Sequence, residues 1–285
     1  MTRTPSKIDQ IADAWVDKIS ELSPTFATYI GRPGGDDKLD DHSPEASEQM
    51  HGEVKRVLGE LAAATPADKV DEVTLDAMQQ DLGLMVELHE AKVERRNLNN
   101  IASPAQGIRD IFDLSKTETE GDWVNLVARM NAVSESLDGY MRTLRQGIEA
   151  KDAPARRQVL TNIDQAEKIA AADGFFQTFA AQAKLENGDL PASLKAEAEK
   201  AADAATAGYQ KFVDFLKNEL LPAANEEDAI GRERYALFSR SFLGAKIDLD
   251  ETYEWGKEEL ARVTAEQDAV AREIKPGATV LEAID

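Results

Sequence analysis

The sequence predicts an all-α protein, a multi-helix antiparallel array of long helices, and three observations lead to this prediction. Apolar residues recur every three or four positions through most of the chain. The composition, 42% hydrophobic and 31% charged with only 6% aromatic residues, is typical of long amphipathic helices. No alternating polar and apolar run longer than a few residues indicates a strand. Short links between the periodic segments favour antiparallel packing of consecutive helices.

Capping residues and prolines place the helices of the first half. Ser6 is a suitable N-cap for the first helix, and Ser103 with Pro104 has the pattern of a helix start. Residues 32–45, RPGGDDKLDDHSPE, are rich in Pro, Gly and Asp and predict a loop. We expect helices over residues 6–22, 45–64, 68–96 and 122–150, with shorter ones beginning at Pro24 and Pro104.

The second half is predicted in the same way. Pro154 and Pro191 each begin a helix, and Asn225 is a suitable N-cap for another. We expect helices over residues 154–172, 191–221, 225–243 and 249–274, the last capped by Asp248 or Asp250. Near the end, KPGATVLEAID has Gly277 as a stop and Thr279 as an N-cap, so one more helix begins there.

The domain organisation predicted for residues 1–285 is a single all-helical region, because no internal repeat and no strong boundary is visible. A helix that begins at Thr279 has only one or two turns before the sequence ends. Isolated helices of that length are unstable in water. We therefore expect the chain to be the N-terminal part of a longer protein.

The composition also excludes several classes of function. The chain has no cysteine, which excludes disulfides, thiolate catalysis and cysteine zinc sites. A formal net charge of −21 argues against nucleic acid and membrane surfaces, because binding either requires clustered Lys and Arg. The N-terminus, MTRTPSKIDQIADAW, lacks the apolar core of a secretory signal, and no run approaches the ~18 apolar residues of a membrane span. We expect a soluble cytoplasmic protein with no nucleic-acid or membrane partner.

The stretch LMVELHEAKVERR, residues 84–96, contains a His-Glu pair on a predicted helix. Helical zinc peptidase sites use the pattern H-E-x-x-H, whose second His follows the first by four residues. The second ligand would here be residue 93, which is Val. Glu90 points about 100° around the helix from His89. We interpret His89 as a packed, half-buried structural residue, and a metal ligand or base is the alternative.

The loop GGDDKLDDHSPE gathers carboxylates around one histidine. Its members are Asp36, Asp37, Asp40, Asp41, His42 and Glu45. Calcium is a candidate ligand, because hard cations take carboxylates from loops, but the order of an EF-hand is not present. We favour a solvated loop rich in helix caps, in which Ser43 and Pro44 begin the next helix. No complete catalytic constellation is visible, so we expect no catalytic residue and no metal ligand in this chain.

Residues 209–271 carry the most distinctive pattern, and they resemble a bacterial family known as domain of unknown function 885. The shared frame consists of Phe215-Leu216, Leu221-Pro222, Gly231-x-x-x-Tyr235 and Gly256-x-x-Glu259-Leu260. The family's early loop is matched at Gly31, Asp36 or Asp37, Leu39, Asp41 and Ser43. Its central helices are matched at Ala128, Arg129, Met130, Leu137, Asp138, Gly147, Ile148 and Arg157.

The resemblance implies a fold similar to that of helical zinc carboxypeptidases, with a His-Glu-x-x-x-x-His-His-like metal motif in the second half of the family. Only the N-terminal half is represented here, so the resemblance implies that zinc binds in the C-terminal half and not in this chain. The hydrolase role rests on analogy of fold. The implied partners are that C-terminal half and a peptide or small amide substrate.

Two functional hypotheses follow from these expectations. In the first, the chain is the non-metal-binding wall of a substrate cleft, inactive alone, and Tyr235 binds substrate through its phenol; a core tyrosine is the alternative. In the second, the chain is a non-catalytic acidic helical protein that binds a protein partner through an apolar groove. Uncovered apolar residues at Val280, Leu281 and Ile284 would favour self-association.

Overall fold

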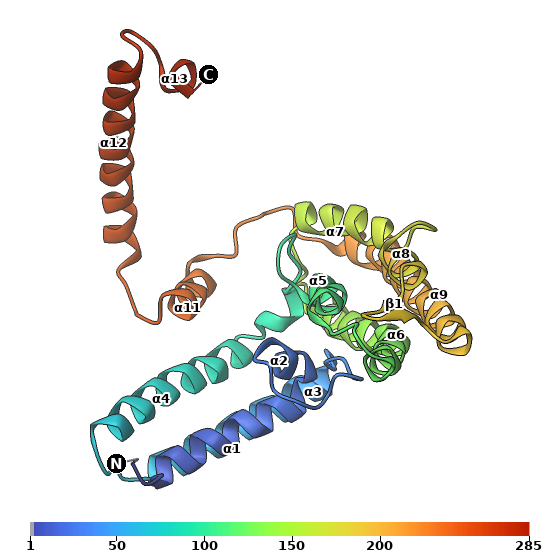
Figure 1. Ribbon diagram of the computed structural model, residues 1–285. Coiled ribbons are helices and arrows are strands. Elements are labelled where there is room, and N and C mark those ends of the chain that lie inside the picture. Colours follow the sequence, from blue (N-terminus) through green and yellow to red (C-terminus); the bar gives the residue numbers. More distant parts are fainter. Residues whose placement is uncertain (1–2, 285) are drawn as a thin grey trace. The chain divides into compact units, whose positions relative to one another are not determined.

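The computed structural model describes residues 3–284, and its contacts divide the chain into two compact units. The first unit extends to Ile230 and the second begins at Gly231, and each is described by itself (Figure 1). Helices account for most of both units, so the predicted all-α class is confirmed. In the described part of the chain, no helix is long and apolar enough to cross a membrane.

The first unit contains all the elements up to Ala223. Its α-helices are α1 (Lys7–Leu22), α2 (Pro24–Tyr29), α3 (Pro44–Ala63), α4 (Lys69–Glu90), α5 (Pro104–Asp110), α6 (Glu120–Glu149), α7 (Arg156–Ile169), α8 (Phe175–Ala181), α9 (Ala192–Phe215) and α10 (Leu221–Ala223). Two 3₁₀ turns, η1 (Val93–Arg96) and η2 (Ile111–Leu114), and a π-helical turn, η3 (Leu216–Leu220), complete the helical elements. Strands β1 (Lys184–Leu185) and β2 (Gly188–Asp189) form a minimal antiparallel hairpin.

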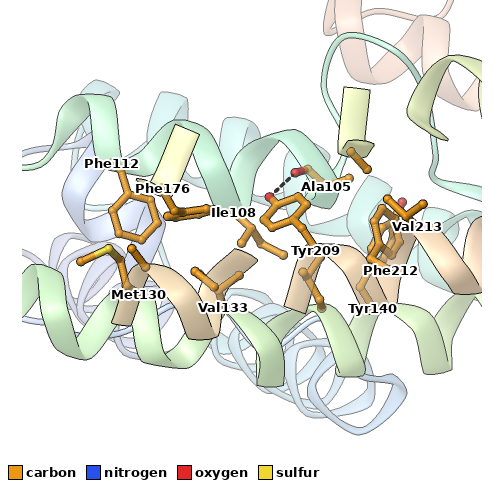
Figure 2. Packing of buried hydrophobic residues seen from close by; sticks show 14 of the residues in the cluster. Ala105, Ile108, Phe112, Met130, Val133, Tyr140, Phe176, Tyr209, Phe212 and Val213 are labelled. Atoms are coloured by element: carbon orange, nitrogen blue, oxygen red, sulfur yellow. Dashed lines mark hydrogen bonds between the residues drawn. The ribbon is translucent and has the colours of Figure 1, made fainter. Parts of the chain in front are cut away.

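The main core lies between the long helices α6 and α9, with α5, α7 and α8 packed against them. Figure 2 shows its centre, where Met130, Val133 and Tyr140 of α6 meet Tyr209 and Phe212 of α9. The Tyr209 hydroxyl donates a hydrogen bond of 2.7 Å to the Ala105 carbonyl oxygen, so this buried phenol is satisfied. This core fixes α6, whose outer face supports the clefts described below.

A second, smaller core joins α1, α3 and α4, which lie alongside one another in Figure 1. Ile11, Val54, Val57, Leu61 and Leu82 are its buried members. The predicted caps appear here: Ser6 accepts hydrogen bonds from the Ile8 and Asp9 amides, and Ser43 accepts one from Ala46.

The second unit consists of α11 (Arg232–Leu243), α12 (Leu249–Ile274) and α13 (Val280–Ile284). Asp248 caps α12 by accepting hydrogen bonds from the Asp250 and Glu251 amides, which settles the two predicted alternatives in favour of Asp248. Arg232 forms a two-pronged ion pair with Asp250, with N···O distances of 2.9 and 2.7 Å.

Two predicted boundaries are wrong by several residues, and one hairpin was not predicted. Asn225 begins no helix, because its amide and carbonyl pair with Pro154 and Arg156, and α11 starts only after Gly231 at a φ of 83°. The helix expected to end at residue 96 ends at Glu90, because Lys92 adopts a left-handed φ of 54°. The hairpin at residues 184–189 was not predicted, because strands this short contain no periodic signal.

Candidate functional site

Three cavities surround η1 in the first unit. The loop cleft, about 600 Å³, includes His42, Tyr140 and Asn97 in its lining. The charged cleft, about 390 Å³, is lined by residues that include Lys92, Arg95, Glu48 and Gln146. The apolar pocket, about 260 Å³, is lined by Met50, Val54, Met85, Leu88 and the two histidines His51 and His89, among others. Ser47 and Glu94 line all three, so the cavities adjoin.

Arg129 of α6 holds the loop that forms one wall of the loop cleft. Its side chain is fully buried, and its guanidinium donates hydrogen bonds of 2.8–3.0 Å to four oxygen atoms. The acceptors are the carbonyls of Gly35 and Lys38 and the hydroxyls of Thr28 and Ser115. Burial lowers the pKa of Arg129, while Asp36, Asp37 and Asp40 act in the opposite direction. Arg129 therefore links the loop, α2 and η2 to the main core.

The carboxylates of the acidic loop serve mainly as caps. Asp40 accepts hydrogen bonds from the Ser23 and Thr25 hydroxyls and from the Thr25 amide, and Asp41 accepts one from the Ser43 amide. These contacts fit the capping interpretation of the loop. Within residues 3–284, no group of three or more His, Asp or Glu side chains is arranged to hold a metal ion.

His42 faces the loop cleft beside Tyr140. The two rings meet edge to face with centroids 6.2 Å apart, and the Tyr140 hydroxyl donates a hydrogen bond of 2.6 Å to the Asn97 carbonyl oxygen. The His42 carbonyl oxygen accepts a hydrogen bond from Thr143, whereas its imidazole forms none with the described residues. Burial lowers the pKa of His42, and Asp40 and Asp41 only partly offset this effect. The neutral imidazole is thus the favoured form.

The sequence did not reveal that His51 and His89 form a pair. One lies on α3 and the other on α4, and their rings stack with centroids 4.1 Å apart and an interplanar angle of 20°. His89 Nδ1 lies 3.2 Å from the Ser47 hydroxyl, and Nε2 lies 3.2 Å from a Glu48 carboxylate oxygen. His89 is half-buried, as predicted. His51 Nδ1 is buried and has no hydrogen-bond partner, and burial, together with His89 and Lys55, lowers the pKa of His51.

The lowered pKa values of His42 and His51 predict a pH dependence of stability. Below the ordinary histidine pKa of 6.5 the unfolded chain binds protons that the folded chain does not. The free energy of unfolding should therefore fall as pH decreases from about 7 into the window below 6.5. Urea denaturation at several pH values measures this slope.

A double variant, His42→Gln with His51→Gln, provides the comparison for that measurement. It should show a shallower loss of stability between about pH 7 and pH 5.5, because two of the groups that gain protons on unfolding are absent. Equal slopes for the double variant and the natural chain would contradict the assignment.

The turn η1 places two neighbouring charged side chains at the clefts. Glu94 and Arg95 are both half-buried, and neither side chain forms a hydrogen bond or ion pair with the described residues. Arg95 Nε is buried without a partner. The turn approaches α6 closely at Gly147, where an added Cβ would lie 2.3 Å from the Arg95 carbonyl oxygen. Glycine at this position thus lets the turn pack against α6.

Sequence reasoning missed Arg129, Glu94 and Arg95 as parts of this site. The sequence analysis named Arg129 only as part of the family pattern. It placed the residues of η1 in a predicted helix over residues 68–96. The run Lys92–Arg96 contains a signal that could have separated η1 from the preceding helix. Only Val93 in this run is apolar, so the periodic pattern of apolar residues stops there.

Tyr235, the predicted substrate-binding residue, lies in the first turn of α11 in the second unit and is 56% exposed. Its amide donates a hydrogen bond to the Gly231 carbonyl oxygen, so the backbone there belongs to the helix. Phe238 and Phe242 of the same helix are also exposed. This exposure agrees with a tyrosine that is available to a partner or ligand, and does not agree with a tyrosine in a core. A substrate role for Tyr235 stays a prediction.

Fold and clefts together define an all-helical protein with two compact units, the first of which contains a set of adjoining polar clefts. The chain belongs to the family described as "Bacterial protein of unknown function (DUF885)", whose family model matches residues 24–285. No curated protein is significantly similar to the chain in sequence.

Two solved structures have a similar fold. A "putative lipoprotein" from Colwellia psychrerythraea matches with a TM-score of 0.77 at 15% identity, over 99% of this chain and 54% of that protein. A "putative lipoprotein of unknown function" from Shewanella oneidensis matches with a TM-score of 0.72 at 16% identity, over 95% of this chain and 48% of that protein. The chain thus spans about half the length of these relatives. At such identities the likeness shows the fold alone.

Proposed function

We propose that this chain is the non-metal-binding wall of a substrate cleft in a hydrolase resembling zinc metallopeptidases, and that the substrate is a peptide or small amide. The observation that supports this proposal most directly is the apolar surface of the second unit. The relatives extend well beyond the matched region, which supplies additional chain length that could cover such a surface. The C-terminal half of the protein is the proposed partner.

The apolar surface is distributed over all three helices of the second unit. Its large exposed side chains are Tyr235, Phe238, Phe242, Leu243, Tyr253, Trp255, Leu260, Val263, Val270, Ile274, Leu281 and Ile284. Phe242 is 90% exposed and Trp255 is 62% exposed. Exposed apolar side chains in this number are candidates to be covered by another segment or protein, because apolar surface that lies together on a protein is typical of interfaces and ligand grooves.

Among residues 3–284, no group of three or more His, Asp or Glu side chains is arranged to hold a metal ion. No catalytic step through zinc is therefore derived for them. In the proposal the zinc belongs to the C-terminal half, and the role of this chain is to bind and orient the substrate. Tyr235 is the proposed substrate contact, because its phenol is a hydrogen-bond donor that could orient a carboxylate or a developing oxyanion.

The apolar surface can be tested on the 285-residue chain itself. We expect the chain to bind the dye 8-anilinonaphthalene-1-sulfonate and to self-associate in sedimentation velocity experiments, because the exposed apolar side chains gain by leaving water. A double variant, Phe242→Ser with Trp255→Ser, should reduce both effects, because it removes two of these exposed side chains. The matched control is Ile101→Ser in the first unit, where the side chain is 79% exposed but lies outside the surface. Dye binding unchanged in the double variant would contradict the assignment.

The same apolar surface also suits the rival function, a non-catalytic acidic helical protein that binds a protein partner. The two candidate functions predict different zinc content and different amidase activity for the complete protein. The hydrolase proposal expects that product to hold zinc and to cleave peptides or small amides, with reduced cleavage in a Tyr235→Phe variant. A complete product that lacks bound zinc and amidase activity would favour the rival.

A further inference from the structure

We infer that the charged cleft and the adjoining apolar pocket bind a small zwitterionic ligand, a free amino acid or short peptide with an apolar side chain. In this arrangement Arg95 binds the ligand's carboxylate and Glu94 binds its ammonium group. The inference goes beyond the proposed hydrolase role, because it requires neither zinc nor a second half of the protein.

Arg95 provides the first observation. Its side chain lines the charged cleft, is half-buried, and has neither an ion pair nor a hydrogen bond with the described residues. Its Nε atom is fully buried and lacks a partner. A ligand in the cleft cannot reach the buried Nε atom, but the two Nη atoms also lack partners among the described residues and are not fully buried, so they are the donors available to a ligand. A carboxylate suits the planar fork of guanidinium donors.

Glu94 provides the second observation. It precedes Arg95 in η1, is half-buried, lines all three cavities, and its carboxylate has no partner among the described residues. Glu94 and Arg95 both line the charged cleft, so a ligand there meets one acidic and one basic side chain. A ligand with both an ammonium and a carboxylate group can pair with the two.

The other charged groups of the charged cleft are already paired, which is why the inference rests on these two residues. Lys92 and His89 both contact the Glu48 carboxylate, at 3.3 and 3.2 Å. Glu45 forms an ion pair with Arg142. A ligand would have to break these pairs to use their charges, whereas Glu94 and Arg95 are available without that cost.

The apolar pocket accounts for the ligand's side chain. It shares Ser47, His89 and Glu94 with the charged cleft, so the two cavities are neighbours. Most of its remaining lining is apolar, from Met50, Val54, Met85 and Leu88. Methionine-lined walls adapt to aliphatic side chains of different shape. A leucine-like side chain could occupy this pocket while its charged groups face η1.

The test is calorimetric titration of the 285-residue chain with four probes: L-leucine, L-leucinamide, N-acetyl-L-leucine and L-leucyl-L-leucine. Leucinamide lacks the carboxylate, and N-acetylleucine lacks the ammonium group. We expect leucine or leucylleucine to bind at least roughly tenfold more tightly than either blocked analogue, because each removes one charge-assisted contact. The tighter of the two zwitterions identifies a free amino acid or a peptide as the ligand.

Variants assign the two charges separately. Arg95→Met should remove the preference for leucine over leucinamide, and Glu94→Gln should remove the preference over N-acetylleucine. Arg56→Met is the matched control, because Arg56 pairs with Glu53 and Glu60, none of these three residues lines the charged cleft or the apolar pocket, and the variant should leave the preferences intact. Circular dichroism establishes that each variant is folded. No saturable binding of either zwitterion, or preferences unchanged in both η1 variants, would overturn the inference.

The outcome is independent of the hydrolase proposal. If the chain binds zwitterions but the complete protein has neither zinc nor amidase activity, the ligand site is supported and the hydrolase proposal is rejected. If the complete protein is a zinc-dependent amidase but no zwitterion binds at η1, the hydrolase proposal is supported and the ligand site is rejected.

Discussion

Replacing Arg129 by methionine should lower the free energy of unfolding by about 3–5 kcal/mol. The substitution keeps much of the buried volume but leaves four oxygen acceptors without the donor that now satisfies them. Urea denaturation, followed by circular dichroism, measures the change. The loop at residues 31–43 should also become more susceptible to proteolysis, because the Gly35 and Lys38 carbonyls lose their anchor.

The control for this prediction is Arg142→Met, on the same helix. Arg142 pairs with Glu45, but its side chain is 49% exposed. Exposed ion pairs contribute less than about 1 kcal/mol, so this variant should be close to the natural chain in stability. If Arg129→Met also proved to be within about 1 kcal/mol of the natural chain, the anchoring role of the guanidinium would be wrong.

The second large effect is expected for Gly147→Ala in α6. A methyl group at this position would lie 2.3 Å from the Arg95 carbonyl oxygen and 3.1 Å from that of Asp152. Because both atoms belong to the backbone, η1 would have to move away from α6, at a cost of about 2–4 kcal/mol by comparison with other overpacked sites. Thermal or urea unfolding measures the loss, and displaced η1 side chains should also weaken any ligand that binds Glu94 and Arg95.

Gly83→Ala in α4 is the matched control for that prediction. Gly83 is also within a helix, and an added Cβ there would meet no atom within 4 Å. Alanine is the better helix former by about 0.5–1 kcal/mol, so this variant should be slightly more stable than the natural chain. The two glycines should thus respond with opposite signs. A Gly147→Ala chain as stable as the Gly83→Ala chain would show that η1 does not pack against α6 in this way.

Local signals in the sequence were sufficient for the class of fold and for most helix starts. Ser6, Ser43 and Ser103 precede helices at the predicted positions, because capping depends on a hydroxyl and on amides two or three residues away. The failure at Asn225 occurred where the backbone makes contacts distant in sequence. Asn225 has the chemistry of a cap, but its backbone pairs with residues 154 and 156, so the helix begins later.

The candidate site depended on tertiary structure to a greater degree. His51 and His89 are 38 positions apart in the sequence, and only the packing of α3 on α4 stacks their rings. Arg129 appeared as one basic residue on a periodic helix, and only the fold reveals that its side chain is buried among acceptors from three other segments. Burial of a charge is decided by neighbours that no local window contains.

By itself, then, the sequence determined the all-helical class, most of the caps and the family, because periodicity, capping and motif order are properties of short segments. The tertiary structure alone decided which charged groups are satisfied and which are not. Glu94 and Arg95 are two ordinary charges in a polar run, and only the fold shows that neither side chain has a partner among the described residues, in a turn that approaches α6 closely at Gly147. That approach depends on contacts between residues more than fifty positions apart, whose energies are set by packing and not by local propensity.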